Sequence, residues 1–191
     1  MQREFDISQL VNHYAARLLL SDWDGFFNNY FLFHDTGGKK KWLLFTWDQD
    51  KTWGDYDGNA ENKLLYDLPL SYGAENDARP TSGGAGWWRS GGNISKPVLA
   101  NPQFRIRYFS RIRELLETEF TEAKLFPLID RYGDRLREEV DLRASATGQA
   151  STRSRQEFES NLASLKEFVT TRREWLLAQK EIRDAAPQPQ R

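Results

Sequence analysis

The sequence predicts one mostly helical α+β domain, and three observations lead to this prediction. Apolar residues recur at helical spacing near the N-terminus and again along most of the chain after residue 101. Two aromatic-rich runs on either side of a glycine turn, between residues 29 and 47, are typical of a β-hairpin. Between these regions, residues 54–103 contain most of the glycines. We expect them to form a long Gly-rich loop beside the functional site.

Composition and charge exclude several classes of function. The 191 residues include 27 Lys and Arg against 28 Asp and Glu, for a net charge of -1, whereas nucleic-acid binders usually carry a basic surplus. The absence of cysteine excludes disulfides, thiolate metal sites and a Cys nucleophile, and two histidines are too few for a His-rich metal site. No apolar run approaches the ~20 residues that span a bilayer. We therefore expect neither a nucleic-acid partner nor a membrane span.

The N-terminal part of the chain predicts a helix followed by the hairpin. Residues 5–20 place their apolar side chains on one helical face, and Asp6 or Ser8 can cap the start of this helix. The two strands of the hairpin flank residues 35–38, whose Asp-Thr-Gly-Gly sequence has turn chemistry. The second strand, residues 41–47, is almost continuously hydrophobic, which predicts burial on both of its faces.

Three helices are expected after residue 101, packed over the hairpin and the loop. Their apolar stripes are formed by Phe104, Tyr108, Ile112, Leu115 and Leu116, by Leu125, Leu128, Ile129, Tyr132, Leu136 and Val140, and by Phe158, Leu162, Leu165, Phe168, Val169, Trp175 and Leu176. The third helix should run from about residue 155 to residue 183. The tail, residues 185–191, lacks apolar periodicity and is predicted to be disordered, which leaves a domain over residues 1–184.

Four polar residues among the aromatics of residues 21–57 form the candidate site. Asp24 is followed five residues later by Asn29, and Asp48 and Asp50 follow the second apolar strand. Phosphoryl transfer requires a carboxylate that orients the attacking hydroxyl and oxygen ligands that hold Mg²⁺ against the phosphates. Protein kinases place a catalytic Asp five residues before a metal-binding Asn, with a second metal-binding Asp after a hairpin. The sequence reproduces that order.

These residue types also occur in other structural settings. Asp24 and Asn29 are also common in helix caps and turns, and a turn after a strand could explain Asp48 and Asp50. A calcium-binding loop starting at Asp48 fails, because its sixth and twelfth positions are occupied by residues other than the required Gly and Glu. A metal-dependent phosphohydrolase ranks last, because the chain lacks the histidines that two-metal hydrolases generally use.

Several neighbouring residues are interpreted as structural. Asp22 fits the spacing to Asn29 worse than Asp24 does, so we expect a cap or a supporting role for it. His34 is interpreted as a packed histidine, and Arg172 and Arg173 as partners in salt bridges on a helix surface. The tryptophans at positions 23, 42, 47 and 53 are expected to pack around the site.

The motifs of the candidate site resemble a known family. From Asp24 the chain reads D-G-F-F-N-N-Y-F-L, and from Thr46 it reads T-W-D-Q-D-K-T-W-G. These stretches resemble the spore-coat protein H (CotH) family of atypical kinases, which shows D-x-x-x-x-N-[YF]-[YF]-L followed by P-W-D-x-D-x-[ST]-[FW]-G. Thr46 stands where that family usually has proline. Residues 101–108 and 168–176 also resemble the C-terminal helices of the family.

The resemblance covers roughly residues 4–180 and implies a role for each candidate residue. Asp24 matches the catalytic aspartate and Asn29 the metal-coordinating asparagine. Asp48 best matches the metal-binding aspartate, although Asp50 could exchange roles with it. By resemblance, the fold is the C-lobe of an atypical protein kinase, and the N-lobe, with its nucleotide-covering loop and phosphate-pairing lysine, is expected to be missing from this chain.

The implied function is an ATP-dependent protein kinase that phosphorylates Ser or Thr of a protein substrate, with ATP and Mg²⁺, or Mn²⁺, as cofactors. Members of the family are often secreted or associated with a bacterial surface or spore coat. The alternative is a non-catalytic module, an incomplete kinase whose Trp-rich loop around Trp87 and Trp88 recognises a partner.

Overall fold

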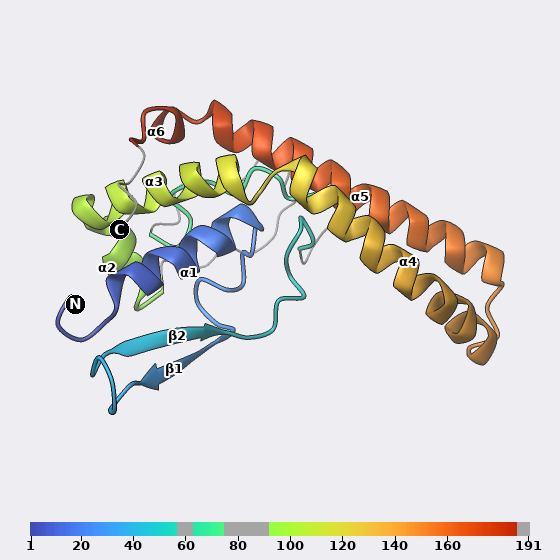
Figure 1. Cartoon of the computed structure of the whole chain (residues 1–191), viewed down its shortest axis with the longest axis horizontal. Helices are drawn as coiled ribbons and strands as arrows, with labels where there is room; N and C mark the ends of the chain where they lie inside the picture. The colour runs from blue at the N-terminus through green and yellow to red at the C-terminus, as the bar shows by residue number, and fades with distance from the viewer. Residues whose placement is uncertain (57–62, 75–91, 187–191) are drawn as a thin grey trace.

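The computed structural model describes residues 1–56, 63–74 and 92–186, and Figure 1 shows these residues as a mostly helical chain with a β-hairpin. The elements in chain order are α1 (Ile7–Leu19), β1 (Tyr30–His34), β2 (Trp42–Thr46), α2 (Ser95–Ala100), α3 (Pro102–Thr118), α4 (Glu122–Ala146), α5 (Ser151–Ala178) and α6 (Lys180–Arg183). The predicted α+β class is confirmed. Helix α2 lies inside the segment predicted to be a loop.

Helix α1 is the central element of the body, since it packs against α3 on one side and the hairpin on another (Figure 1). Asp6 caps its start by accepting a hydrogen bond from the main-chain nitrogen of Gln9 at 3.1 Å. The Gln9 side chain then binds both main-chain groups of Leu44, with Nε2 donating to the carbonyl at 2.5 Å and Oε1 accepting from the amide at 3.1 Å. These bonds attach β2 to α1.

The hairpin pairs β1 and β2 antiparallel, with Tyr30 opposite Thr46 and His34 opposite Trp42. The carboxylate of Asp35 accepts hydrogen bonds from the main-chain nitrogens of the two residues that complete the turn, at 2.8 and 2.9 Å. The predicted hairpin and its turn are therefore confirmed.

The prediction that the second strand is buried on both faces is wrong. Leu44 is 2% exposed, but the adjacent Phe45 is 52% exposed. Alternate residues of a strand point to opposite faces, and α1 covers only the face that contains Leu44. On the outer face the aromatic rings pack in pairs, Phe31 with Trp47 at 5.5 Å and Phe33 with Phe45 at 5.9 Å between ring centres.

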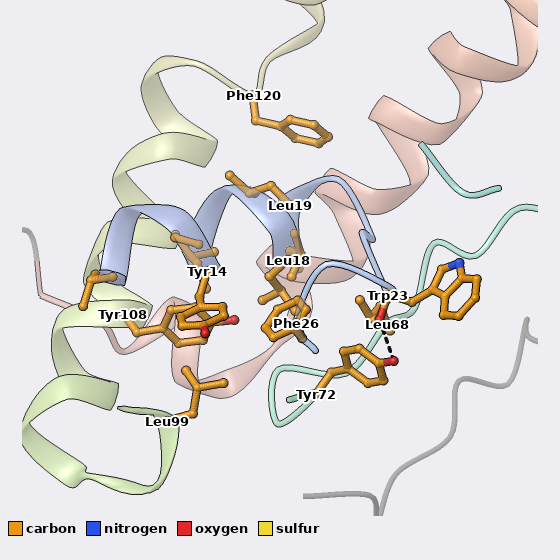
Figure 2. Close-up of a cluster of buried hydrophobic side chains, with 14 of the residues drawn as sticks. Tyr14, Leu18, Leu19, Trp23, Phe26, Leu68, Tyr72, Leu99, Tyr108 and Phe120 are labelled. Atoms are coloured by element: carbon orange, nitrogen blue, oxygen red, sulfur yellow. Dashed lines mark hydrogen bonds between the residues drawn. The ribbon is translucent and has the colours of Figure 1, made fainter. Parts of the chain in front are cut away.

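The core lies between α1, α3, the C-terminal half of α5 and the segment 63–74 (Figure 2). Tyr14 of α1 stacks on Phe26 with 5.3 Å between ring centres, so the residues after α1 are anchored in this core. Tyr72 donates a hydrogen bond from its hydroxyl to the main-chain carbonyl of Trp23 at 2.8 Å. Both contacts fix the chain on either side of Asp24.

Helices α4 and α5 form an antiparallel arm that projects from the body (Figure 1). They approach so closely that a Cβ on Gly133 would lie 2.6 Å from a methyl carbon of Leu162. The expectation that all three C-terminal helices cover the hairpin is wrong, because α4 packs on α5, and Tyr132 and Leu136 of its predicted apolar stripe are 51% and 49% exposed. The predicted helix over residues 155–183 also breaks, since Gln179 separates α5 from α6.

Two predictions fall partly or wholly on residues outside the described ranges. The Gly-rich run with Trp87 and Trp88 lies in residues 75–91, and most of the tail lies in residues 187–191. Among the helices that the structure describes, none is both long and apolar enough to cross a bilayer.

Candidate active site

The candidate catalytic carboxylate lies in the turn that joins α1 to β1. Asp24 accepts one hydrogen bond on each carboxylate oxygen: Asn28 Nδ2 lies 3.1 Å from Oδ1, and Asn29 Nδ2 lies 2.8 Å from Oδ2. Asp24 and Asn29, which the sequence pointed to by their spacing and by the family resemblance, are therefore in direct contact. The turn also explains the contact, because it folds the chain back within five residues.

Asn29 connects this turn to the end of β2. Its main-chain carbonyl accepts hydrogen bonds from the amide of Trp47 at 2.9 Å and from Arg17 Nη2 at 2.6 Å. Its φ of 57° lies in the left-handed region, which asparagine tolerates better than most residues. Because the side-chain nitrogen donates to Asp24, the carboxamide oxygen Oδ1 faces away from that carboxylate. A hard cation could bind this oxygen.

The other two candidate ligands lie within three residues after Trp47. Asp48 and Asp50 are exposed, and neither carboxylate makes a hydrogen bond or ion pair with another described residue. Asp48 also has a left-handed φ, 51°. The backbone bond between Asn29 and Trp47 places the chain leading into Asp48 beside the turn that contains Asp24.

This donor set fits Mg²⁺ by its chemistry. Mg²⁺ prefers one or two carboxylates together with neutral oxygens and water, which Asn29, Asp48 and Asp50 can supply. Left-handed backbone at two non-glycine positions, Asn29 and Asp48, is the type of local strain that is common at functional sites. Within residues 1–56, 63–74 and 92–186, no three His, Asp or Glu side chains cluster closely enough to hold a metal by themselves.

A buried cluster to which no sequence motif pointed lies directly beneath the turn. Arg17 of α1 is 1% exposed and donates to three groups: Nε to His13 Nε2 at 2.9 Å, Nη1 to an Asp22 carboxylate oxygen, and Nη2 to the Asn29 carbonyl. The sequence contains one indication of this cluster, because Arg17 occupies the helical face formed by Tyr14 and the other apolar residues of α1. A charged residue at such a position is rarely buried without partners.

Burial dominates the protonation of this cluster. It lowers the pKa of His13 to about 3, so this histidine is neutral and accepts the Arg17 hydrogen bond at Nε2. Burial also raises the pKa of Asp22 to about 6, although the charge of Arg17 and the hydrogen bond from Gly25 act in the opposite direction. The pKa of Arg17 is lowered by the same desolvation, which the nearby Asp22 carboxylate partly offsets.

The interpretations of the neighbouring residues have mixed outcomes. Asp22 caps the turn, accepting a hydrogen bond from the Gly25 amide at 2.8 Å, and His34 packs on Trp42 with 4.7 Å between ring centres, as predicted. The prediction for Arg172 is wrong: it is fully buried and donates to main-chain carbonyls. Trp47 is 60% exposed and packs on Phe31 at the outer face of the hairpin, directly before Asp48.

Comparison with known families supports the resemblance found in the motifs. The family model described as CotH kinase protein matches residues 1–176 of this chain, which include the turn, the hairpin and most of the helical arm. No curated protein matches the chain.

Proposed function

We propose, from the premise that this chain belongs to the CotH kinase family, that it transfers the γ-phosphoryl group of ATP to a Ser or Thr hydroxyl of a protein substrate. The proposal treats the described body as the C-lobe portion of an atypical kinase. The main observation in support of the proposal is the position of Asn29. Its side chain donates a hydrogen bond to Asp24, and its main-chain carbonyl accepts one from Trp47, the residue before Asp48.

Asp24 is the proposed catalytic residue. Each of its carboxylate oxygens accepts one amide hydrogen bond, which orients the group and leaves lone pairs that can accept the proton of an incoming hydroxyl. Such a carboxylate orients the attacking oxygen toward the phosphoryl group and accepts its proton as the new bond forms. Asn28 and Asn29 then keep the carboxylate in place.

Asn29, Asp48 and Asp50 are the proposed ligands of Mg²⁺ or Mn²⁺, with Asp50 assisting Asp48. A divalent cation bound to them would neutralise negative charge on the ATP phosphates. Asp48 and Asp50 are exposed, so they can reach a nucleotide without a change in the core.

Calorimetric titration of ATP into the purified chain, with Mg²⁺ and then Mn²⁺, tests this proposal. We expect metal-dependent binding that Asp48→Asn abolishes and Asp24→Asn largely retains. Asp134 is an exposed carboxylate on α4, so Asp134→Asn is the matched control and should bind ATP like the wild type. Phosphoryl transfer to a mixed Ser/Thr peptide library should then be lost in Asp24→Asn. The proposal fails if the wild type binds no nucleotide with either metal, or if Asp24→Asn transfers phosphate normally.

A second candidate, a non-catalytic partner-binding module, is favoured by one observation. The outer face of the hairpin exposes four aromatic side chains, Phe31, Phe33, Phe45 and Trp47, each at least 50% accessible. Contiguous exposed apolar surface often marks a protein interaction site. The same titration separates the two candidates, because a binding module of this kind predicts no metal-dependent ATP binding.

A further inference from the structure

We propose that Arg17 is a positioning residue for phosphoryl transfer, because its guanidinium holds both ends of the turn that contains Asp24. The inference rests on the proposed kinase function and extends it to a residue outside the family motifs. Arg17 lies in α1, before the turn begins, and it contacts none of the three side chains proposed to bind the metal, those of Asn29, Asp48 and Asp50.

The guanidinium closes the turn into a ring. Nη1 pairs with the carboxylate of Asp22 at the start of the turn, and Nη2 donates to the main-chain carbonyl of Asn29 at its end, at 2.6 Å. Asp24 lies between these two anchor points. Because one rigid planar group bonds to both ends, the distance between the ends is fixed by the geometry of the guanidinium.

The guanidinium is itself held firmly. Its third nitrogen, Nε, donates a hydrogen bond to His13 Nε2 at 2.9 Å. Arg17, His13 and Asp22 are each at most 5% exposed. Gly25 lies against it so closely that a Cβ at this position would fall 1.4 Å from Nη1. The turn therefore wraps tightly around the group that ties its ends together.

These hydrogen bonds determine where the candidate catalytic residues lie. The Asn29 carbonyl that Arg17 binds also accepts the Trp47 amide, and the Asn29 side chain donates to Asp24. If the carbonyl moves, the Asp24 carboxylate loses a fixed hydrogen-bond donor and the start of the Asp48 segment shifts. Lysine has a single ammonium and cannot bond simultaneously to His13, Asp22 and Asn29 in the same plane.

The test compares Arg17→Lys with Arg172→Lys. Arg172 is an equally buried arginine that also donates to main-chain carbonyls but bonds to none of the described residues of the turn, so it controls for the cost of replacing a buried guanidinium. One readout needs no activity: the solvent exchange of the Asn29 side-chain amide in NMR spectra of the folded chain. The other readout is the steady-state kinetics of phosphoryl transfer to a Ser/Thr peptide library, measured under conditions in which both variants are folded.

In Arg17→Lys we expect the protected Asn29 amide signal to be lost and kcat to fall by about 100-fold, with the KM for ATP changed less than about threefold. Arg172→Lys should keep the amide signal and a kcat near that of the wild type. The inference is overturned if Arg17→Lys retains the amide protection, or if its kcat falls no further than that of Arg172→Lys. A wild type without transfer activity would refute the proposed function, while the amide measurement would still decide whether Arg17 positions Asn29.

Discussion

Arg172 of α5 donates a hydrogen bond from Nη2 to the main-chain carbonyl oxygen of Leu18 in α1, at 2.6 Å. Its Nη1 donates to the carbonyls of Tyr66 and Leu68 at 2.8 and 2.9 Å. One buried side chain thus joins α5, the segment 63–74 and the last turn of α1, which leads into the turn that contains Asp24. Desolvation lowers the pKa of Arg172 to about 9, so the group stays charged at neutral pH.

Replacing Arg172 with methionine should lower the free energy of unfolding by about 3–5 kcal/mol. The substitution keeps much of the apolar volume but leaves two buried carbonyls and one half-buried carbonyl without these donors. Each such loss at a buried group costs about 1–3 kcal/mol. Urea denaturation measures the change. Arg173→Met, at a half-buried neighbouring position, is the matched control and should cost under about 1 kcal/mol. Equal losses in the two variants would contradict the assigned role.

Gly25→Ala should disrupt the candidate site without removing any of its polar groups. The new methyl group would lie 1.4 Å from Arg17 Nη1 and 2.5 Å from an Asp22 carboxylate oxygen, so the guanidinium has to move. We expect a loss of about 3 kcal/mol, since a buried ion pair is strained or broken. Thermal denaturation checks this. Gly37→Ala, where nothing lies within 4 Å of the added Cβ, should stay within about 0.5 kcal/mol of the wild type.

His13 should make stability depend on pH. Its folded-state pKa is about 3, below the ordinary value of 6.5, so between these values the unfolded chain binds a proton that the folded chain does not. The free energy of unfolding therefore falls as the pH drops through this range, by about 1.4 kcal/mol per pH unit from this group. Asp22 contributes a slope of opposite sign between about pH 4 and 6, because its folded-state pKa is raised.

The difference between wild type and His13→Gln isolates the histidine. Urea denaturation at several pH values should show the wild type losing stability relative to this variant as the pH falls from 6 toward 4. Parallel curves for the two proteins would mean that His13 titrates alike in the folded and unfolded chain.

Two adjacent residues of β2 should respond very differently to truncation. Leu44→Ala removes a side chain that is 2% exposed beneath α1, and should cost about 2–5 kcal/mol. Phe45→Ala removes a side chain that is 52% exposed and pairs with Phe33, and should cost about 1 kcal/mol. Denaturant unfolding compares the two. Similar costs would imply that the outer face of the hairpin is covered in solution.

Local patterns predicted the secondary structure and part of the site. The Asp6 cap, the Asp35 turn and the helical stripes are determined by interactions within a few residues, which is why they could be recognised in the sequence. The pair Asp24 and Asn29 was likewise found by its spacing, since five residues of turn bring the two side chains into contact. The family match over residues 1–176 agrees with those motifs.

Only the tertiary structure decided which surfaces and charges are buried. A hydrophobic strand looks the same in sequence whether one face or two are covered, so the exposed side of β2 could not be predicted from its residues. Arg172 was assigned to the surface because its partners are carbonyls more than 100 residues away in the chain. Arg17 binds Asn29 across 12 residues and a change of direction, and no local pattern specifies such a contact. The sequence therefore determined the local elements and the motif, while packing between distant segments decided what holds the motif in place.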